Sequence, residues 1–466
     1  MAQDAGQAAA APTDDPLLRA RQALAAKRFG EAEGICRDLL GSDPQNADAL
    51  GILGTLFGQL GRVQNAVALY ERALALRPNN GVWLGNLSEL YRLVYRIDDA
   101  LAAALRALQL NPPAALNLVR LAKIRTDRGE FDAALQSFLA ALALDPEDAN
   151  AHLGIGQILL ARGEYRPGWI EYEWRNKLPQ AKQMVPRMKA PLWNGMALPN
   201  ARVLLVGDQG YGDVIHFARY IPRVVERCKE VVIGCSADLQ PLLARVPGVA
   251  GCFHRWQEAP TFTAYMLLSS LPYLFGTDTQ SIPGEVPYLS LDPEKVAKWR
   301  TRLGELCGEG VRKVGLFWAG RAAHPNNLRR SMRLAALQPL GGIDGIRFLS
   351  LQKEVPPADG PDLAAFPGMV DISADLANFD ETAAVIGNLD LLITVDSAVA
   401  HLAGALNRPV WMLTPRPSDW RWMLERADSP WYPSLRLFRQ PRPGAWAEVV
   451  EAVRLELAAF ASAGTL

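Results

Sequence analysis

The chain has 466 residues, more than a single hydrophobic core accommodates, so two to four domains are expected. Lys plus Arg and Asp plus Glu each number 49, and this balance argues against a general nucleic-acid binder, which needs a basic surface. Widely spaced cysteines, no apolar run near ~18 residues and no positively charged N-terminal segment predict a cytoplasmic protein without a membrane span or secretory signal.

Residues 15–175 show the period of a tetratricopeptide repeat, following a segment, 1–14, that we expect to be disordered. Prolines recur every 34 residues, at Pro44, Pro78, Pro112 and Pro146. Small residues that let two helices approach, and large ones that fill the space between them, recur at matching positions, in one repeat at Leu50, Leu53, Gly54, Phe57, Ala66, Tyr70 and Ala73. The pattern predicts an α-solenoid whose groove binds a protein partner; a spacer or dimerisation arm is the alternative.

The last repeat begins near Ala149 and ends in the sequence GWIEYEWR, where aromatic residues replace the usual small ones. We expect this repeat to dock on the next domain as a cap. Residues 176–200 then contain four prolines and neither a helical nor a strand period, which predicts a linker.

Strands and helices alternate after this linker. Strands are expected at RVLLVG, EVVIGC, KVGLFWAG, IRFLSLQ, LDLLITV and PVWMLT. Such alternation is typical of doubly wound parallel sheets. We predict two Rossmann-like domains, 201–295 and 296–440, that face a cleft, with a C-terminal helix in 441–466. The predicted fold class is therefore α plus α/β.

The first glycine-rich loop, in VLLVGDQGYGDVIHFARY, follows a strand and begins a helix. Gly210 and Gly212 let the backbone turn and approach a ligand, but Ile215 occupies the third position of a GxGxxG pattern, so no dinucleotide site is predicted. Asp213 lies at the carboxyl end of the strand, where it either takes a proton from an acceptor hydroxyl or only caps the helix. We interpret His216 as a core histidine.

A second loop, in LLITVDSAVAHLAGAL, begins another helix. Asp396 and Ser397 supply the cap, and the free amides behind them predict an anion site, which small residues such as Ala398 leave open to a phosphate. Asp396 should point aside, capping amides or binding a sugar hydroxyl, and His401 donates to a phosphate oxygen. The alternative is a plain capped helix with His401 packed inside.

Upstream residues complete the predicted donor site. Trp318 ends a strand, Arg330 lies in the basic loop behind it, and Gln352 ends the next strand, where it contacts a base or sugar or is a surface amide. The aromatic residues Trp420, Trp422, Trp431 and Tyr432 are interpreted as packing. No DxD motif or His/Cys/Asp cluster occurs, so neither a metal nor another cofactor is expected.

The two loops resemble motifs of a known family. GDVIHFARYIP resembles the Gly-Asp-Val loop of bacterial heptosyltransferases, and LLITVDSAVAHLAGALNRPVWMLTP resembles their nucleotide-sugar loop. Over residues 15–460 the chain resembles tetratricopeptide-linked bacterial glycosyltransferases, which join repeats to a GT-B half made of two Rossmann-like domains. It departs from the family at Ser397, where threonine is usual, at Ala398, where glycine is usual, and at Asp208, where glutamate is frequent.

This resemblance implies an inverting, metal-independent glycosyltransferase that uses a nucleotide sugar. Asp213 then acts as the base or aligns the acceptor, while the loop at Ser397 and the guanidinium of Arg330 neutralise the leaving phosphate. The repeats would recruit a protein acceptor, such as flagellin, for transfer to Ser or Thr. The alternatives are a heptosyltransferase-like enzyme acting on a glycolipid and a non-catalytic adaptor.

Overall fold

The structure of the protein is a computed structural model that describes residues 15–111, 114–179, 181, 188–322, 324 and 326–462. The expected disorder of residues 1–14 lies outside this range. Contacts between Cα atoms divide the chain into two compact units, residues 1–146 and 147–466. In the described part of the chain, no helix combines the length and apolarity needed to cross a bilayer.

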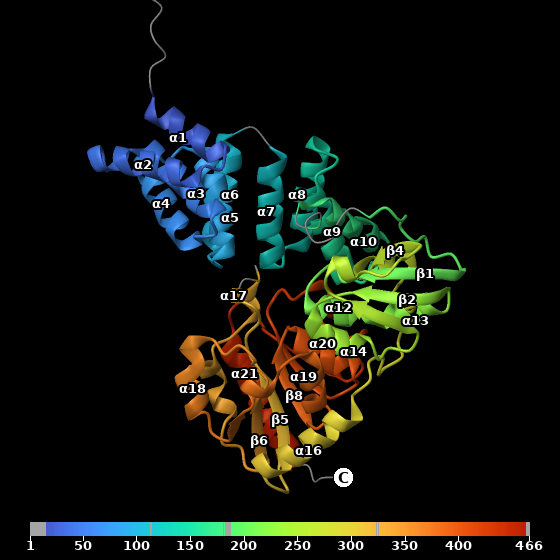
Figure 1. Cartoon of the computed structure of the whole chain (residues 1–466). Helices are drawn as coiled ribbons and strands as arrows, with labels where there is room; N and C mark the ends of the chain where they lie inside the picture. The colour runs from blue at the N-terminus through green and yellow to red at the C-terminus, as the bar shows by residue number, and fades with distance from the viewer. Residues whose placement is uncertain are drawn as a thin grey trace, which may run out of the picture. The chain divides into compact units, whose positions relative to one another are not determined.

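The first unit is built of helix pairs, as the proline period predicts (Figure 1). Its helices are α1 (Pro16–Ala25), α2 (Phe29–Ser42), α3 (Ala47–Gln59), α4 (Val63–Leu76), α5 (Gly81–Leu93), α6 (Ile97–Leu110), α7 (Ala115–Arg128) and α8 (Phe131–Leu144). The second helix of a pair ends two residues before Pro44, Pro78 and Pro146; Pro112 lies outside the described residues.

Close packing within a pair explains the small residues of the repeat. A Cβ atom on Gly54 of α3 would lie 3.0 Å from the ring of Tyr70 on α4, so only glycine lets these helices approach so far. The Tyr70 ring is 1% exposed, and its hydroxyl lies 2.7 Å from that of Thr55. Buried area and a satisfied hydrogen bond thus hold the pair together.

The second unit begins with the fifth helix pair, α9 (Ala149–Ala161) and α10 (Tyr165–Tyr172). Trp169 of α10 is 1% exposed, and its Nε1–H donates to the carbonyl oxygen of Thr277 at 2.9 Å. Its ring meets that of Trp420 edge-to-face at 5.2 Å. The aromatic residues that replace small ones therefore dock this pair on the α/β part, as expected for a cap.

Two parallel sheets follow. The first has the order β3-β2-β1-β4 and the second β10-β9-β8-β5-β6-β7. The first contains β1 (Leu198–Val206), β2 (Cys228–Gly234), β3 (Val249–Phe253) and β4 (Ala264–Leu267). The second contains β5 (Arg312–Phe317), β6 (Ile346–Ser350), β7 (Met369–Asp371), β8 (Leu391–Val395), β9 (Val410–Thr414) and β10 (Leu435–Arg439). The predicted helical repeats followed by parallel sheets are confirmed.

The sheets are flanked by helices of unequal length. The longer ones are α16 (Pro293–Cys307), α19 (Phe379–Ile386), α20 (Ala398–Ala405) and α21 (Trp446–Ser462), the last being the predicted C-terminal helix. The shorter ones are α12 (Tyr211–Phe217), α13 (Ile221–Val225), α14 (Gln240–Leu243), α15 (Leu271–Leu274), α17 (Asn327–Arg330) and α18 (Gly360–Ala365). β8 is buried at every position, so it forms the centre of the second sheet.

Part of the predicted linker is anchored. Trp193 is 2% exposed, and its backbone N–H donates to the carbonyl oxygen of Tyr265 at 2.8 Å. Leu192 forms a parallel bridge with Tyr265 beside β4. One buried tryptophan thus holds a segment that has no period for a sequence pattern to detect.

Candidate functional site

The strand order of the second sheet indicates where a ligand would bind. β5 lies between β8 and β6, and the connections from β5 and β8 lead to opposite ends of the sheet. In open α/β sheets, ligands bind at the carboxyl ends of the strands at this switch point. Trp318 follows β5 and Asp396 follows β8, so the predicted donor residues begin at this point.

The loop after β8 leaves free amides. Ser397 is the N-cap of α20, and its hydroxyl oxygen accepts from the N–H of Ala400 at 3.4 Å. Among the described residues, no acceptor is found for the N–H groups of Ala398 and Val399. Because the first amides of a helix carry partial positive charge, this arrangement suits an anion.

Ser397 itself is less available than predicted. The hydroxyl of Thr394 donates to the carbonyl oxygen of Val395 at 2.9 Å, so the hydroxyl of Ser397, 3.1 Å away, is the donor in the bond between the two side chains. Ser397 is 4% exposed. The hydroxyl of Ser397 is therefore used within the protein, so Ser397 contributes to the predicted phosphate loop by holding its backbone.

Asp396 is half-buried and takes no part in the cap. Burial, and next the negative charge of Asp419, raise the pKa of Asp396 to about 6, against the lowering effect of the Arg330 cation. A carboxyl group with this pKa is largely protonated in mildly acidic solution. In that state it does not repel a phosphate and has a proton to donate.

The two predicted loops meet. A Cβ atom on Gly212 of α12 would lie 3.4 Å from the Cα of Ala398 and 2.8 Å from the Cδ2 of His401. α12 and α20 accordingly lie side by side (Figure 1), and their side chains share one apolar core. Glycine at position 212 is what lets the carboxylate loop of the first sheet touch the amide loop of the second.

Asp213 is held from two sides. Its Oδ2 accepts from the N–H of Gly210 at 3.0 Å, and its Oδ1 forms an ion pair with Arg421. Burial raises the pKa of Asp213, and the Arg421 cation opposes this rise. A quarter of the side chain stays exposed at 25%, so the carboxylate has lone pairs free for an incoming hydroxyl.

Arg421 is a residue that the sequence analysis missed. Its guanidinium is 7% exposed, also binds Asp419 at 2.9 Å, and lies 4.2 Å from the ring centroid of Trp420. Its Nε is buried and finds no partner in the part of the chain that the structure describes. The available signal was a cation among the tryptophans of DWRW, a setting that suits a buried, hydrogen-bonded arginine.

The backbone after Arg421 is strained. Met423 and Glu425 have φ angles of 53° and 54°, in the left-handed region that residues with a side chain rarely adopt. Such conformations persist only where the surroundings hold them, and they gather at functional sites. This segment holds Arg421 and Trp422 beside the two loops.

Arg330 lies against the loop after β5. A Cβ atom on Gly320 would lie 2.7 Å from its Nη2, and its Nε is buried with no partner among the described residues. Its charge acts on Asp396 and on His401. Arg330 therefore lies near the free amides with a spare donor, which agrees with a role at a phosphate.

Trp318 and Gln352 differ from the prediction that they contact the donor. Trp318 is 0% exposed, and its Nε1–H donates to Asp359 at 2.9 Å. The amide oxygen of Gln352 accepts from the N–H groups of Trp318 and Ala319, and its Nε2 donates to the carbonyl oxygens of Ala319 and Glu354. Both side chains face the core, so they support the loop after β5.

His401 is 5% exposed and stacks on Trp422 with ring centroids 5.1 Å apart. Its Nδ1 lies 2.9 Å from the hydroxyl of Tyr432. His216 is fully buried, as predicted for a core histidine. Burial is the main cause that lowers the pKa of both histidines well below the usual value, so both are neutral.

Outside the two loops, the described residues offer weaker candidates for a ligand site. Within the described residues, no group of three or more His, Cys, Asp or Glu side chains is suited to hold a metal ion.

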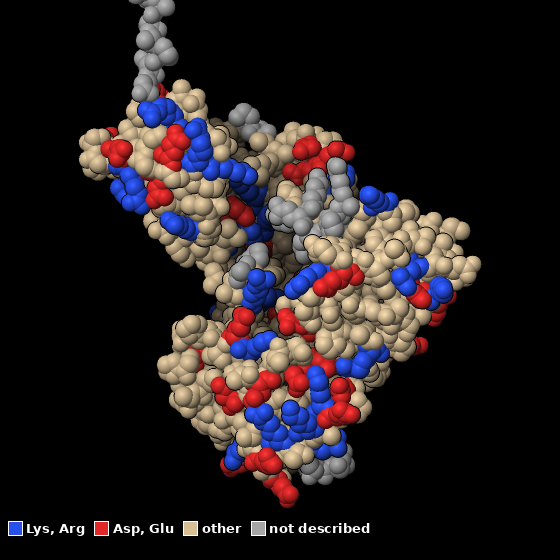
Figure 2. All heavy atoms as spheres, in the orientation of Figure 1, with Lys and Arg blue, Asp and Glu red and all other residues tan. Residues whose placement is uncertain are grey.

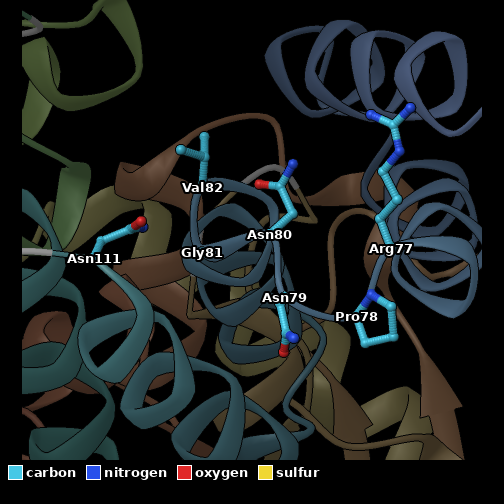
Figure 3. A pocket seen from close by; sticks show the side chains of 7 residues that line it. All are labelled: Arg77, Pro78, Asn79, Asn80, Gly81, Val82 and Asn111. Carbon is cyan, nitrogen blue, oxygen red and sulfur yellow. The ribbon is translucent and has the colours of Figure 1, made fainter.

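A pocket in the first unit is lined by Arg77, Pro78, Asn79, Asn80, Gly81, Val82 and Asn111 (Figure 3). Arg77 is paired with Asp48, and Asn80 caps α5, so the pocket has few free donors. On the face that Figure 2 displays, acidic and basic side chains are interspersed.

Comparisons with known proteins find matches in both the repeats and the second sheet. Residues 17–81 match the family described as tetratricopeptide repeat, and residues 122–163 match a further family of the same repeat. Residues 369–415, which run from β7 through β8 and the whole of α20 to β9, match glycosyltransferase family 9 (heptosyltransferase). The chain thus joins tetratricopeptide repeats to a segment that is similar to glycosyltransferase family 9.

Among curated proteins, Protein FlbA of Caulobacter vibrioides is 30% identical in an alignment over 327 residues, and the match covers 63% of this chain and 52% of FlbA. This chain thus spans about half the length of the curated relative it matches. Among solved structures, PilF of Pseudomonas aeruginosa is 22% identical, with 35% of this chain and 74% of that chain covered and a TM-score of 0.32. A repeat protein of Thermus thermophilus is 23% identical, with 36% and 92% covered and a TM-score of 0.31.

Proposed function

We propose that the protein is an inverting glycosyltransferase that moves a sugar from a nucleotide sugar to a hydroxyl of a protein acceptor. The observation that carries the proposal is the contact between Gly212 and Ala398, which joins a carboxylate loop to an amide loop at the carboxyl ends of two parallel sheets. The family 9 segment covers the amide loop and supports glycosyl transfer as the reaction. The GT-B arrangement and the cytoplasmic location are part of this proposal.

The donor diphosphate binds at the start of α20. The N–H groups of Ala398 and Val399 and the guanidinium of Arg330 supply donors that have no acceptor among the described residues. Together they stabilise the negative charge that grows on the leaving phosphate as the sugar departs. Trp318 and Gln352 act indirectly, by fixing the backbone that ends β5.

The acceptor hydroxyl attacks the anomeric carbon on the face opposite the phosphate. A C–O bond to the acceptor forms, the C–O bond to the phosphate breaks, and the hydroxyl proton passes to Asp213. Burial raises the pKa of this carboxyl group and makes it a stronger base. Arg421 stays paired with one carboxylate oxygen and orients it.

The repeats recruit the protein acceptor. Helix pairs stacked at a constant period form an extended concave surface, which suits a polypeptide better than a small molecule. We propose that the sugar is transferred to a Ser or Thr hydroxyl of this acceptor. The alternative is a heptosyltransferase-like enzyme that acts on a glycolipid, and the acceptor experiment below distinguishes the two.

The first test is calorimetric titration of the full chain with UDP-, GDP-, ADP-, CMP- and dTDP-sugars. We expect one donor to bind, and Asp213→Asn to bind it with unchanged affinity while transfer falls by about 100-fold or more. Absence of binding by every donor would contradict an enzyme and favour an adaptor. Transfer that survives Asp213→Asn would remove Asp213 from the mechanism.

The acceptor is identified by intact mass spectrometry of proteins and glycolipids from cells with and without this protein. We expect a sugar mass to disappear from a protein when the chain is absent. A chain that lacks residues 1–146 should still hydrolyse the donor slowly but no longer modify that protein. Loss of the sugar from a glycolipid alone would refute the proposed protein acceptor.

A further inference from the structure

A buried tyrosine joins two buried histidines next to the proposed donor site. The hydroxyl of Tyr432 lies 2.9 Å from the Nδ1 of His401 and 3.0 Å from the Nδ1 of His216. Tyr432 and His216 are both 0% exposed. Since a single hydroxyl carries one proton, it donates to one histidine and accepts from the other.

A neighbouring tyrosine, Tyr288, limits which groups can accept the hydroxyl proton of Tyr432. The hydroxyl of Tyr288 donates to the carbonyl oxygen of Ile215 at 3.0 Å, so it has no second proton for Tyr432, which lies 3.4 Å away. Tyr432 is neutral, because burial raises its pKa well above the usual value. Its proton therefore goes to the nearer acceptors, the two histidine rings.

His216 is the better donor of the two. Its Nε2 is buried and has no partner among the described residues, so a proton placed there would be an unsatisfied N–H. The cations of Arg219 and Arg421 lower the pKa of this ring further, so it stays neutral and carries a single proton. The proton of His216 consequently lies on Nδ1, which donates to the oxygen of Tyr432.

We propose that Tyr432 is a positioning residue whose hydroxyl donates to Nδ1 of His401 and so keeps the proton of that ring on Nε2. The Nε2 of His401 lies 3.5 Å from the Cβ position of Gly212, at the junction of the two loops. This inference deepens the proposed function: the ring presents a neutral N–H to the donor diphosphate. The opposite tautomer would direct a lone pair at an anion and repel it.

The surroundings of His401 keep its ring neutral, as a donor of the Nε2 proton to the diphosphate requires. Burial, followed by the charges of Arg421, Arg219 and Arg330, lowers the pKa of His401. The Trp422 ring stacks on one face of the imidazole. A neutral Nε2–H keeps the same strength as a hydrogen-bond donor throughout the neutral pH range. An imidazolium would instead lose a proton within that range.

The protonation pattern is tested first by long-range proton–nitrogen correlation spectra of the full chain labelled with ¹⁵N-histidine. The chain has five histidines, and His401→Gln and His216→Gln assign the two rings by loss of signals. We expect His401 protonated at Nε2 and His216 at Nδ1, with His401 becoming a mixture in Tyr432→Phe. A proton on Nδ1 of His401 in the unsubstituted protein would overturn the inference.

Nucleotide binding then tests whether a proton on Nε2 of His401 increases affinity for the diphosphate. We titrate UDP, GDP, ADP and CDP and use the one that binds. Tyr432→Phe should weaken its affinity by about 5- to 10-fold. His401→Gln, which keeps an N–H near the Nε2 position, should lose less affinity than His401→Asn, which places its amide near Nδ1. Equal affinity in all variants would refute the role at the donor.

The spectra test the tautomer assignment and the titrations test nucleotide binding, so either claim can be refuted without the other. If no nucleotide binds the unsubstituted protein but the spectra show the expected protons, the proposed function is wrong and the tautomer assignment stands. If nucleotides bind and Tyr432→Phe leaves the His401 signals unchanged, the proposed function stands and Tyr432 does not position the ring. Thermal unfolding of each variant shows that loss of affinity does not arise from loss of the fold.

Discussion

The loops after β1 and β8 have the same architecture and opposite chemistry. Each leaves a strand at the switch point of a parallel sheet and begins a short helix. In the first loop, Asp213 of the helix turns back and accepts from the N–H of Gly210. In the second, Ser397 accepts from Ala400 and leaves the amides of Ala398 and Val399 open. The amide of the first loop therefore binds the carboxylate of the loop's own Asp213, whereas the amides of the second loop are available to an external anion.

A single cation links the two loops. Arg421 pairs with Asp213 of the first loop and with Asp419 beside the second. Asp419 in turn raises the pKa of Asp396. The protonation states of the two loops are thus connected through buried charges, and the comparison between them is best tested by changing these groups one at a time.

The largest expected effect follows from Arg421→Ala. Removing one partner of a buried ion pair leaves the other unsatisfied, so the free energy of unfolding should fall by about 3 kcal/mol. The pKa of Asp213 should also rise further, since the Arg421 cation opposes the effect of burial. Urea unfolding measures the first effect, and the pH profile of transfer measures the second.

Arg426→Ala is the matched control for this change. Arg426 pairs with Asp428 at 2.6 Å, but the two side chains are 34% and 70% exposed. An exposed pair contributes at most about 1 kcal/mol, so this variant should unfold close to the unsubstituted protein. Equal losses for both arginines would mean that burial of Arg421 has no special importance.

Gly212→Val should separate the two loops. Its Cβ would lie 2.8 Å from His401 and 3.4 Å from the Ala398 backbone, so α12 must move. We expect a loss of about 2 kcal/mol in unfolding free energy, together with loss of transfer. Gly304→Val in α16, where nothing lies within 4 Å of the Cβ position, should leave both unchanged. A stable, active Gly212→Val protein would show that the contact is not needed.

The sequence predicted the repeats and the interior strands well, for a physical reason. Small residues recur 34 positions apart, at Gly54, Ser88 and Ala122, because each helix pair repeats the same close packing. The strands that were not predicted, β3, β4, β7 and β10, are the four edge strands of the two sheets. These edge strands are partly exposed, so they lack the continuous buried apolar run that marks β8.

The site was only partly predictable. Both loops were located because a capped helix after an apolar strand is a local pattern. Arg421 was missed because its partner Asp213 is 208 residues away, which no local pattern reveals. Trp318 and Gln352 were assigned to the ligand because they end strands, but the sequence does not show whether such a side chain faces the crevice or the core.

Asp396 gives the pH dependence of the second loop. Its pKa of about 6 in the folded protein exceeds the reference value of 3.8. The folded state therefore binds more protons between these values, and this group's contribution to stability decreases as pH rises from about 4 to about 6. Donor affinity should also fall as pH rises through about 6, because an ionised Asp396 repels the diphosphate.

Calorimetry with the binding nucleotide between about pH 5 and pH 8 measures this fall, which we expect to be about 10-fold. Phosphate groups also titrate near pH 6, so Asp396→Asn is compared over the same range. The asparagine variant should show only the dependence that belongs to the nucleotide. Identical curves for the two proteins would exclude Asp396 from the donor site.

The smallest effect is expected from Ser397→Ala, which tests whether a cap in the second loop does more than stabilise a helix. Loss of a side-chain cap costs about 1 kcal/mol. Asn46→Ala removes a comparable cap, that of α3, where the side chain accepts from the N–H of Ala49 at 3.0 Å. Both variants should therefore lose similar stability in urea unfolding. Only Ser397→Ala should also weaken nucleotide binding, by about 3-fold, because the amides of Ala398 and Val399 lose the anchor that aims them. If Asn46→Ala weakened binding as much, the loss would reflect general destabilisation, and the second loop would be no better suited to an anion than any other capped helix.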